Sequence, residues 1–126
     1  MSFFSTYKNS VKAFSIMFLL LLTMMLQGAQ AKQTARPKVI EFYASWCEPC
    51  RRLQPAMDRV RAEYGTDVEF ERVNVDDPAS RDIVEKYGVC PIPTVIFEDA
   101  EKNVKAYAVG CTEDRNIQSG ISKILM

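Results

Sequence analysis

The feature that most constrains this chain is the stretch 41–55, EFYASWCEPCRRLQP, in which only two residues separate Cys47 from Cys50. The chain has four cysteines in all, and a pair this close can be a redox couple, half of a metal site or a structural staple. The preceding residues, 38–44, are mostly apolar with β-branched and aromatic side chains, and they predict a buried strand. The pair therefore lies where a strand passes into the next element.

The sequence beyond the pair predicts alternating strands and helices. An apolar stripe with helical spacing follows the cysteines and is closed by Gly65; its members are Leu53, Met57, Val60 and Tyr64. Further strands are predicted at 68–75, 94–97 and 104–109, a polar turn at 98–103, a short helix over 83–87, and a last helix from Thr112 with the stripe Ile117, Ile121 and Ile124. A strand–helix–strand unit implies a parallel pair, and the short turn implies an antiparallel hairpin. We expect an α/β fold in the order β-α-β-α-β-β-α, with a four-stranded mixed sheet flanked by helices.

Composition excludes several classes of function. Sixteen basic and sixteen acidic residues cancel, so the chain does not offer the basic face of a nucleic-acid binder. It contains no histidine, which removes imidazole bases, Cys–His nucleophile pairs and histidine metal ligands. We therefore expect no nucleic-acid partner, no metal and no cofactor.

The first 31 residues are predicted to be a cleaved signal peptide. Lys8 and Lys12 precede an uncharged apolar run at 13–26, and Ala29-Gln30-Ala31 has the small-x-small pattern of a cleavage site. A membrane anchor is the alternative, but spanning a bilayer takes about 20 apolar residues. Cleavage would leave a domain at 32–126 with a net charge of 14 − 16 = −2, exported to the periplasm or secreted. We expect a monomer that is not inserted in the membrane, in an oxidising compartment.

The predicted position of the close pair gives its two sulfurs different roles. Cys47 falls at the first turn of a helix, where free backbone N–H groups and the helix dipole favour a thiolate. Pro49 suits this first turn, and Cys50 points to the same side one turn later. We therefore expect Cys47 to be the exposed nucleophile, which forms a mixed disulfide with a substrate, and Cys50 to be the buried resolving sulfur.

An ordered set of segments resembles the thioredoxin family. The matching segments are WCEPC at 46–50, Pro55, VNVDDP at 73–78, YGVCPIPTVIF at 87–97 and Val109-Gly110, so the resemblance covers roughly residues 38–125. It implies a minimal thioredoxin fold and a thiol–disulfide oxidoreductase. Its partners would be disulfide-containing proteins and an electron donor, such as a membrane thiol reductase.

The resemblance also implies roles for the cis-proline segment. Pro93 would be cis, because the family has a cis proline in this segment, and a cis bond makes a sharp turn. That turn would leave the backbone of Ile92 free to pair with an extended substrate. Trp46 would shield the sulfur and shape the rim of the groove; the alternative is that it fills the core.

Glu41 interrupts an apolar strand, where a charge is unfavourable unless it is used. It matches the buried aspartate of thioredoxins, and in that role it would accept the proton from Cys50. The alternative is an edge position, in contact with solvent or with Lys38.

Charges around the cysteines bear on the direction of electron flow. Glu48 disfavours a thiolate and so favours the disulfide form, whereas Arg51 and Arg52 act the other way. We expect a reductase. One rival is a dedicated cytochrome c maturation reductase, which typically carries an insertion that VNVDDPASRDIV at 73–84 lacks. A redox-inactive binding or chaperone domain on the same fold and a four-cysteine zinc module are the others.

Cys90 and Cys111 lie outside the family pattern. If the hairpin turns between Ala100 and Glu101, facing residues sum to 201, and Cys90 then faces Cys111. Of the three pairings that four cysteines allow, 47–50 with 90–111 fits best. The second pair would be a staple, a further redox couple or a steric element that selects the partner.

Overall fold

The computed structural model describes residues 12, 14–22, 35–110 and 114–126. The chain divides into two compact units, residues 1–33 and 34–126. In the first unit, residues 14–22 are helical and exposed. Within the described part of the chain, no helix has both the length and the apolar character needed to cross a membrane.

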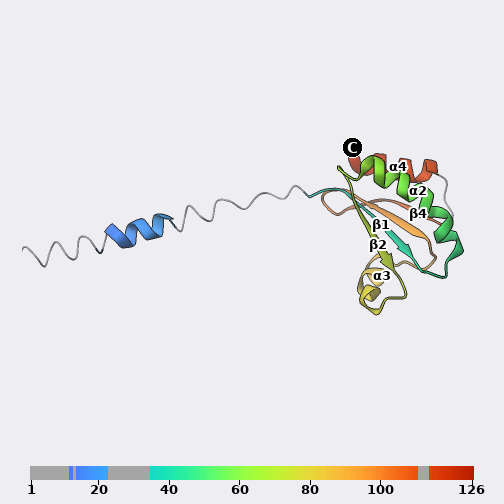
Figure 1. The fold of residues 1–126 in the computed structure, drawn as a ribbon, viewed down its shortest axis with the longest axis horizontal. Helices are drawn as coiled ribbons and strands as arrows, with labels where there is room; N and C mark the ends of the chain where they lie inside the picture. The colour runs from blue at the N-terminus through green and yellow to red at the C-terminus, as the bar shows by residue number, and fades with distance from the viewer. Residues whose placement is uncertain (1–11, 13, 23–34, 111–113) are drawn as a thin grey trace, which may run out of the picture. The chain divides into compact units, whose positions relative to one another are not determined.

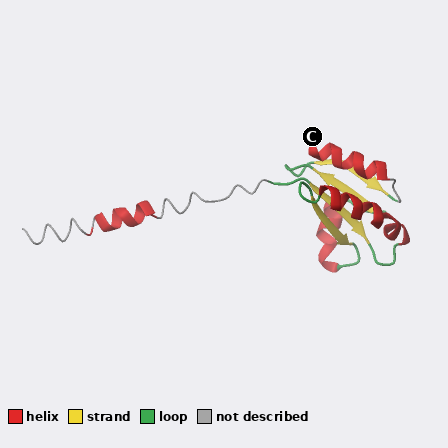
Figure 2. Cartoon of the chain, turned by 45° about the horizontal axis from the view of Figure 1, so that its top comes forward, coloured by secondary structure: helices red, strands yellow, loops and turns green. Residues whose placement is uncertain are grey.

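The second unit is a four-stranded sheet with helices on both faces, which confirms the predicted α/β fold (Figures 1 and 2). The strands are β1 (Lys38–Tyr43), β2 (Glu69–Asn74), β3 (Thr94–Glu98) and β4 (Val104–Val109), in the spatial order β2-β1-β3-β4. The helices are α2 (Glu48–Tyr64), α3 (Arg81–Tyr87), which follows the 3-10 turn η1 (Pro78–Ser80), and α4 (Asp114–Leu125). As predicted, β1 and β2 are parallel, and β3 and β4 form an antiparallel hairpin.

Alternating side chains divide the core between the two faces of the sheet. Val39, Val95 and Phe97 join the buried cluster that contains the stripes of α2 and α4. Ile40, Phe42 and Ile96 face the other way, and Ile83, Val84 and Tyr87 of α3 pack there. The predicted α2 stripe is confirmed: Leu53, Met57 and Val60 are buried and Tyr64 packs beside them.

The contact between α4 and the sheet requires a glycine. A Cβ added at Gly120 would lie 2.5 Å from Cζ of Phe97, whose ring is fully buried. Because the core is close-packed, that ring has no space to retreat into. Gly120 therefore lets α4 approach β3 closely.

The register of the hairpin differs from the predicted one. Thr94 faces Val109, so facing residues sum to 203 rather than 201, and the register shifts between Phe97 and Glu98. This irregularity lengthens one strand relative to the other, as a bulge does. Glu98 consequently belongs to β3 and is buried, whereas the sequence placed it in the polar turn. The prediction that Cys90 faces Cys111 depended on a ladder with a sum of 201 that extends to Cys90. The observed ladder has another register and begins at Thr94, so it does not support that prediction.

Candidate active site

Cys47 and Cys50 form a disulfide at the start of α2, with their Cα atoms 5.3 Å apart. Cys47 is the N-cap of the helix, and its sulfur accepts a hydrogen bond from the backbone N–H of Cys50 at 3.2 Å. Pro49 occupies the first turn, as predicted, where its missing N–H leaves no intrahelical bond unmade. The sulfur of Cys47 therefore lies at the positive end of the helix dipole, which would stabilise a thiolate in the reduced state.

The expectation of an exposed Cys47 is wrong for this disulfide state. Cys47 is 3% exposed and Cys50 is 2% exposed, so the two sulfurs do not differ in burial. They pack with Ala44 against the partly buried side chains of Tyr43, Val75 and Ile92. The helix N-terminus fixes the backbone position of Cys47. The solvent exposure of its sulfur is determined by these neighbouring side chains.

The Ile92–Pro93 peptide bond is cis, as predicted. The carbonyl of Pro93 accepts a hydrogen bond from the N–H of Gly110 at 2.8 Å, which fastens the loop to the end of β4. Gly110 has a φ of 79°, a left-handed conformation that favours glycine. Because Ile92 packs against the cluster formed by Ala44, Cys47 and Cys50, the cis bond lies beside the disulfide.

Trp46 stands at the rim of this site. Its side chain is 68% exposed, so it does not fill the core. The indole Nε1–H donates a hydrogen bond to Oδ2 of Asp76 at 2.8 Å, which joins the turn before α2 to the turn after β2. This hydrogen bond orients the indole ring, which belongs to the residue that precedes Cys47.

Glu41 is completely buried, with an exposed fraction of 0%. Arg72 of β2 donates from Nε to Oε2 of Glu41 at 3.0 Å and forms an ion pair with it. Gln54 of α2 donates from Nε2 to both carboxylate oxygens, at 2.9 Å and 3.1 Å. A buried carboxylate needs such partners, because an unpaired one would be strongly destabilising.

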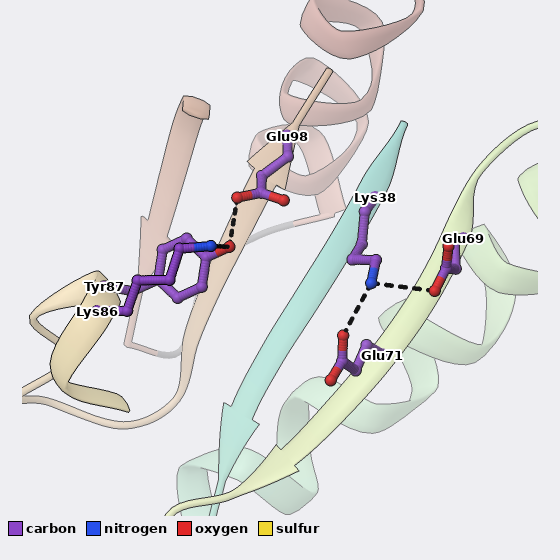
Figure 3. A network of polar contacts seen from close by, with 6 residues as sticks. All are labelled: Lys38, Glu69, Glu71, Lys86, Tyr87 and Glu98. Carbon is purple, nitrogen blue, oxygen red and sulfur yellow. Dashed lines mark hydrogen bonds and ion pairs between the residues drawn. The ribbon is translucent and has the colours of Figure 1, made fainter. Parts of the chain in front are cut away.

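The alternative interpretation of Glu41 is excluded by the contacts of Lys38. Figure 3 shows that the ammonium group of Lys38 binds Glu69 and Glu71 of β2, at 3.1 Å each. Glu41 therefore neither pairs with Lys38 nor reaches solvent. Arg72 and Gln54 were not identified from the sequence, because each is distant in the chain from Glu41 and neither belongs to a motif. The helical spacing of Gln54, four residues after Cys50, was the available signal.

Glu48, the charged residue between the two cysteines, is paired with a residue of opposite charge. Glu48 forms an ion pair with Arg51, three residues later on the same helix. The hydrogen bond and charge of Arg51, with a smaller effect of Arg52, hold the pKa of Glu48 below its ordinary value. Glu48 is therefore ionised at neutral pH, and its effect on a nearby thiolate is opposed by Arg51.

Cys90 is exposed and forms no disulfide with another cysteine that the structure describes. Cys111 lies outside the described residues, as do Thr112 and Glu113 at the predicted start of the last helix. The pairing of Cys90 with Cys111 therefore stays a prediction. Among the residues that the structure describes, no group of three or more cysteine or acidic side chains could hold a metal ion.

The fold and the site together define an α/β domain with a cysteine pair that can alternate between dithiol and disulfide. The pair lies at a helix N-terminus and beside a cis-prolyl loop, and it follows β1, the strand that carries the buried Glu41. A family model described as Thioredoxin matches residues 27–123. The chain belongs to the thioredoxin family.

Individual relatives agree with this family. The chloroplastic thioredoxin-like protein HCF164 of Arabidopsis thaliana is 37% identical over 81 residues, which are 64% of this chain and 31% of the relative. Thioredoxin-T of Drosophila melanogaster is 40% identical over 77 residues, 61% of this chain and 47% of the relative. The chain thus spans about a third to about half of the length of these relatives. The crystal structure of mitochondrial thioredoxin 3 from Saccharomyces cerevisiae, in the oxidized form, has 32% identity and a TM-score of 0.60, covering 72% of this chain and 80% of that chain.

Proposed function

We propose that this chain is an exported thiol–disulfide oxidoreductase that reduces protein disulfides through the Cys47/Cys50 couple. One observation carries the proposal: the two cysteines are bonded at the N-terminus of α2, in contact with the residue that precedes the cis Pro93. A staple at this position would need neither the helix N-terminus nor the cis loop. Membership of the thioredoxin family supports the same activity.

In the proposed reaction, the Cys47 thiolate of the reduced protein attacks one sulfur of a substrate disulfide. A Cys47–substrate bond forms, and the other substrate sulfur leaves as a thiolate. Cys50 then gives its proton to Glu41 and attacks the sulfur of Cys47. The Cys47–Cys50 bond forms and the substrate leaves as its second thiolate. The substrate gains two electrons and the protein dithiol loses them.

Substrate binding is assigned to the cis-prolyl loop and the adjacent indole. The half-buried Ile92 adjoins the cysteines, and its backbone would pair with an extended segment of the substrate. Trp46 offers a large exposed ring at the same rim. Such contacts recognise backbone and shape, which suits a protein that acts on disulfides in different sequences.

Export to the periplasm or the exterior is part of the proposal and rests on the sequence. The basic residues, apolar run and Ala-x-Ala site of residues 1–31 have the pattern of a signal peptide. A reductase in an oxidising compartment needs a supply of electrons, and a membrane thiol reductase would provide it. We expect the mature domain, residues 32–126, to act as a monomer.

The proposal is tested by trapping with Cys50→Ser. This variant should stop at the mixed disulfide on Cys47, and mass spectrometry of the trapped complexes from the periplasmic fraction should identify substrates. The matched control is the double variant Cys47→Ser, Cys50→Ser, which keeps Cys90 and Cys111 and should trap nothing. The wild-type chain should also catalyse the reduction of insulin by dithiothreitol. Equal trapping by the two variants, or no insulin reduction, would contradict the proposal.

A further inference from the structure

The two carboxylate oxygens of Glu41 accept different numbers of hydrogen bonds. Oε2 accepts hydrogen bonds from both Arg72 and Gln54, whereas Oε1 accepts one, from Gln54. Oε1 is therefore the oxygen with more free acceptor capacity, and the one better able to take a proton. Gln54 lies four residues after Cys50 on α2, so the two side chains are neighbours on the helix surface. Gln54 thus donates to Glu41 and lies one helical turn after Cys50, and these are the two groups between which the proton would pass.

We propose that Gln54 is a positioning residue, which aims the Glu41 carboxylate at Cys50 and stays hydrogen-bonded to it before and after proton transfer. This inference rests on the proposed function, because it concerns the resolving step of that reaction. It adds a residue that the cysteine motif does not contain.

The chemistry of an amide explains why Gln54 suits this position. Its NH₂ group donates to an ionised carboxylate, and after rotation its carbonyl oxygen can accept from a protonated one. Arg72 has donors only, so it serves the ionised form alone. Since Glu41 is completely buried, a form without a partner would be strongly disfavoured. Gln54 allows the carboxylate to change its protonation state without losing that partner.

The resolving step can be isolated with the aromatic disulfide DTNB. In a full-length chain carrying Cys90→Ser and Cys111→Ser, Cys47 attacks DTNB and releases one coloured thiolate in a phase whose rate is proportional to the DTNB concentration. Cys50 then attacks Cys47 and releases the second coloured thiolate in a phase whose rate does not depend on that concentration. The first phase reports on Cys47, and the second reports on the proton transfer from Cys50.

Gln54→Met keeps the length of the side chain and removes its hydrogen bonds. We expect the second phase to slow about tenfold, a part of the 10²–10⁴-fold effect of general-base catalysis, with the first phase unchanged. The matched control is Gln118→Met, the same change on α4, where the glutamine contacts the Tyr64 hydroxyl. It should leave both phases at the rates of the parent chain. Gln54→Asn, whose amide is one methylene shorter, should have a smaller effect and replaces the methionine variant if that one does not fold.

The pH profile separates positioning from a structural role. The groups that face Glu41 are Arg72 on β2, Gln54 on α2 and the apolar Val95 on β3. The bond that Gln54 donates to the ionised carboxylate is charge-assisted and stronger than the bond it accepts from the protonated acid. Gln54→Met therefore weakens the ionised form more, and the acid limb of the second phase should move to higher pH. A purely structural residue would leave that limb in place.

Two results would overturn the inference in different ways. If Gln54→Met retains the rate and pH profile of the second phase while Glu41→Gln slows it, Gln54 has no positioning role and the proposed function stands. If the parent chain releases no second thiolate, Cys47 and Cys50 do not exchange, and the proposed function fails together with the inference.

Discussion

Among the described residues of this domain, two glutamates are buried, one within β1 and one at the end of β3, and they have different partners. Glu41 is 0% exposed, belongs to β1 and is bound by the guanidinium of Arg72 and the amide of Gln54. Glu98 is 4% exposed, belongs to the far end of β3 and accepts a hydrogen bond from the hydroxyl of Tyr87. Figure 3 shows this second contact, together with the ammonium of Lys86 that donates to the same hydroxyl at 2.9 Å.

The difference bears on the proposed role of Glu41 as a proton acceptor. Glu41 has partners from two separate elements, α2 and β2, and one of them is a neighbour of Cys50. Glu98 has a partner on α3, the short helix that covers the opposite face of the sheet. The first arrangement joins a carboxylate to the helix that carries Cys50, whereas the second joins α3 to β3. Burial of an acid alone therefore does not mark a reactive group; its partners do.

The largest expected effect separates the two glutamates by activity. Glu41→Gln removes the proposed proton acceptor and should lower the rate of insulin reduction by about 100-fold. Glu98→Gln makes the same chemical change and should leave that rate close to the wild-type value. Turnover of insulin at neutral pH measures both. A similar loss of activity in the two variants would contradict the proposal that Glu41, and not Glu98, accepts the proton.

The next effect is on stability and concerns Glu98. Tyr87→Phe removes the hydroxyl and leaves a buried carboxylate without this donor, which should cost about 1–3 kcal/mol of unfolding free energy. Urea unfolding measures the change. Tyr64→Phe is the matched control: its hydroxyl donates to a half-buried Gln118, and its loss should matter less. Insulin reduction should be retained in both variants, and its loss in Tyr87→Phe would assign Glu98 a role in catalysis.

Stability at alkaline pH is a further test of the contact between Tyr87 and Glu98. Burial, and then the hydrogen bond to Glu98, raise the pKa of Tyr87 above its ordinary value of 10.0. The folded protein therefore favours the neutral phenol, and this contribution to stability is complete below pH 10 and is lost as the pH rises through the pKa of the folded protein. The wild type should lose stability more steeply than Tyr87→Phe above pH 10, as followed by urea unfolding at successive pH values.

The smallest effect is expected at Asp99. This residue follows Glu98 in the chain, and its hydrogen-bond partners belong to the turn after β3 and to β4. Partial burial opposes its ionisation, but hydrogen bonds from the backbone and side chain of Asn103 and from Lys105 lower the pKa of Asp99 to about 2. Its contribution is present above pH 3.8 and is lost as the pH falls through about 2. Asp99→Asn should therefore lose less stability than the wild type over this interval. Parallel acid unfolding curves would show that the turn does not depend on this charge.

The elements of this fold were predictable because their signals are local. The stripe of α2 repeats over several turns, and the mixed sheet follows from the lengths of the connections between strands. The cis bond at Pro93 was implied by a family motif rather than by a physical property of the segment. These features depend on residues that are close in the chain.

The remaining features depend on contacts between distant residues. The burial of Glu98 could not be predicted, because its partner Tyr87 belongs to another element and because the irregularity after Phe97 moves the register. The partners of Glu41 follow from the pairing of β1 with β2 and from the approach of α2, which the sequence does not specify residue by residue. The burial of Cys47 depends on packing around the disulfide.

The ion pair between Glu48 and Arg51 has a consequence for selectivity. Opposite charges that neutralise one another next to the disulfide exert a weak field on an approaching molecule, and salt screens what is left of it. Acidic and basic substrate proteins would thus approach the surface formed by Glu48 and Arg51 at similar rates. Arg52 leaves a small positive charge beside this pair, so encounter rates at the Glu48–Arg51 surface should change only modestly with ionic strength.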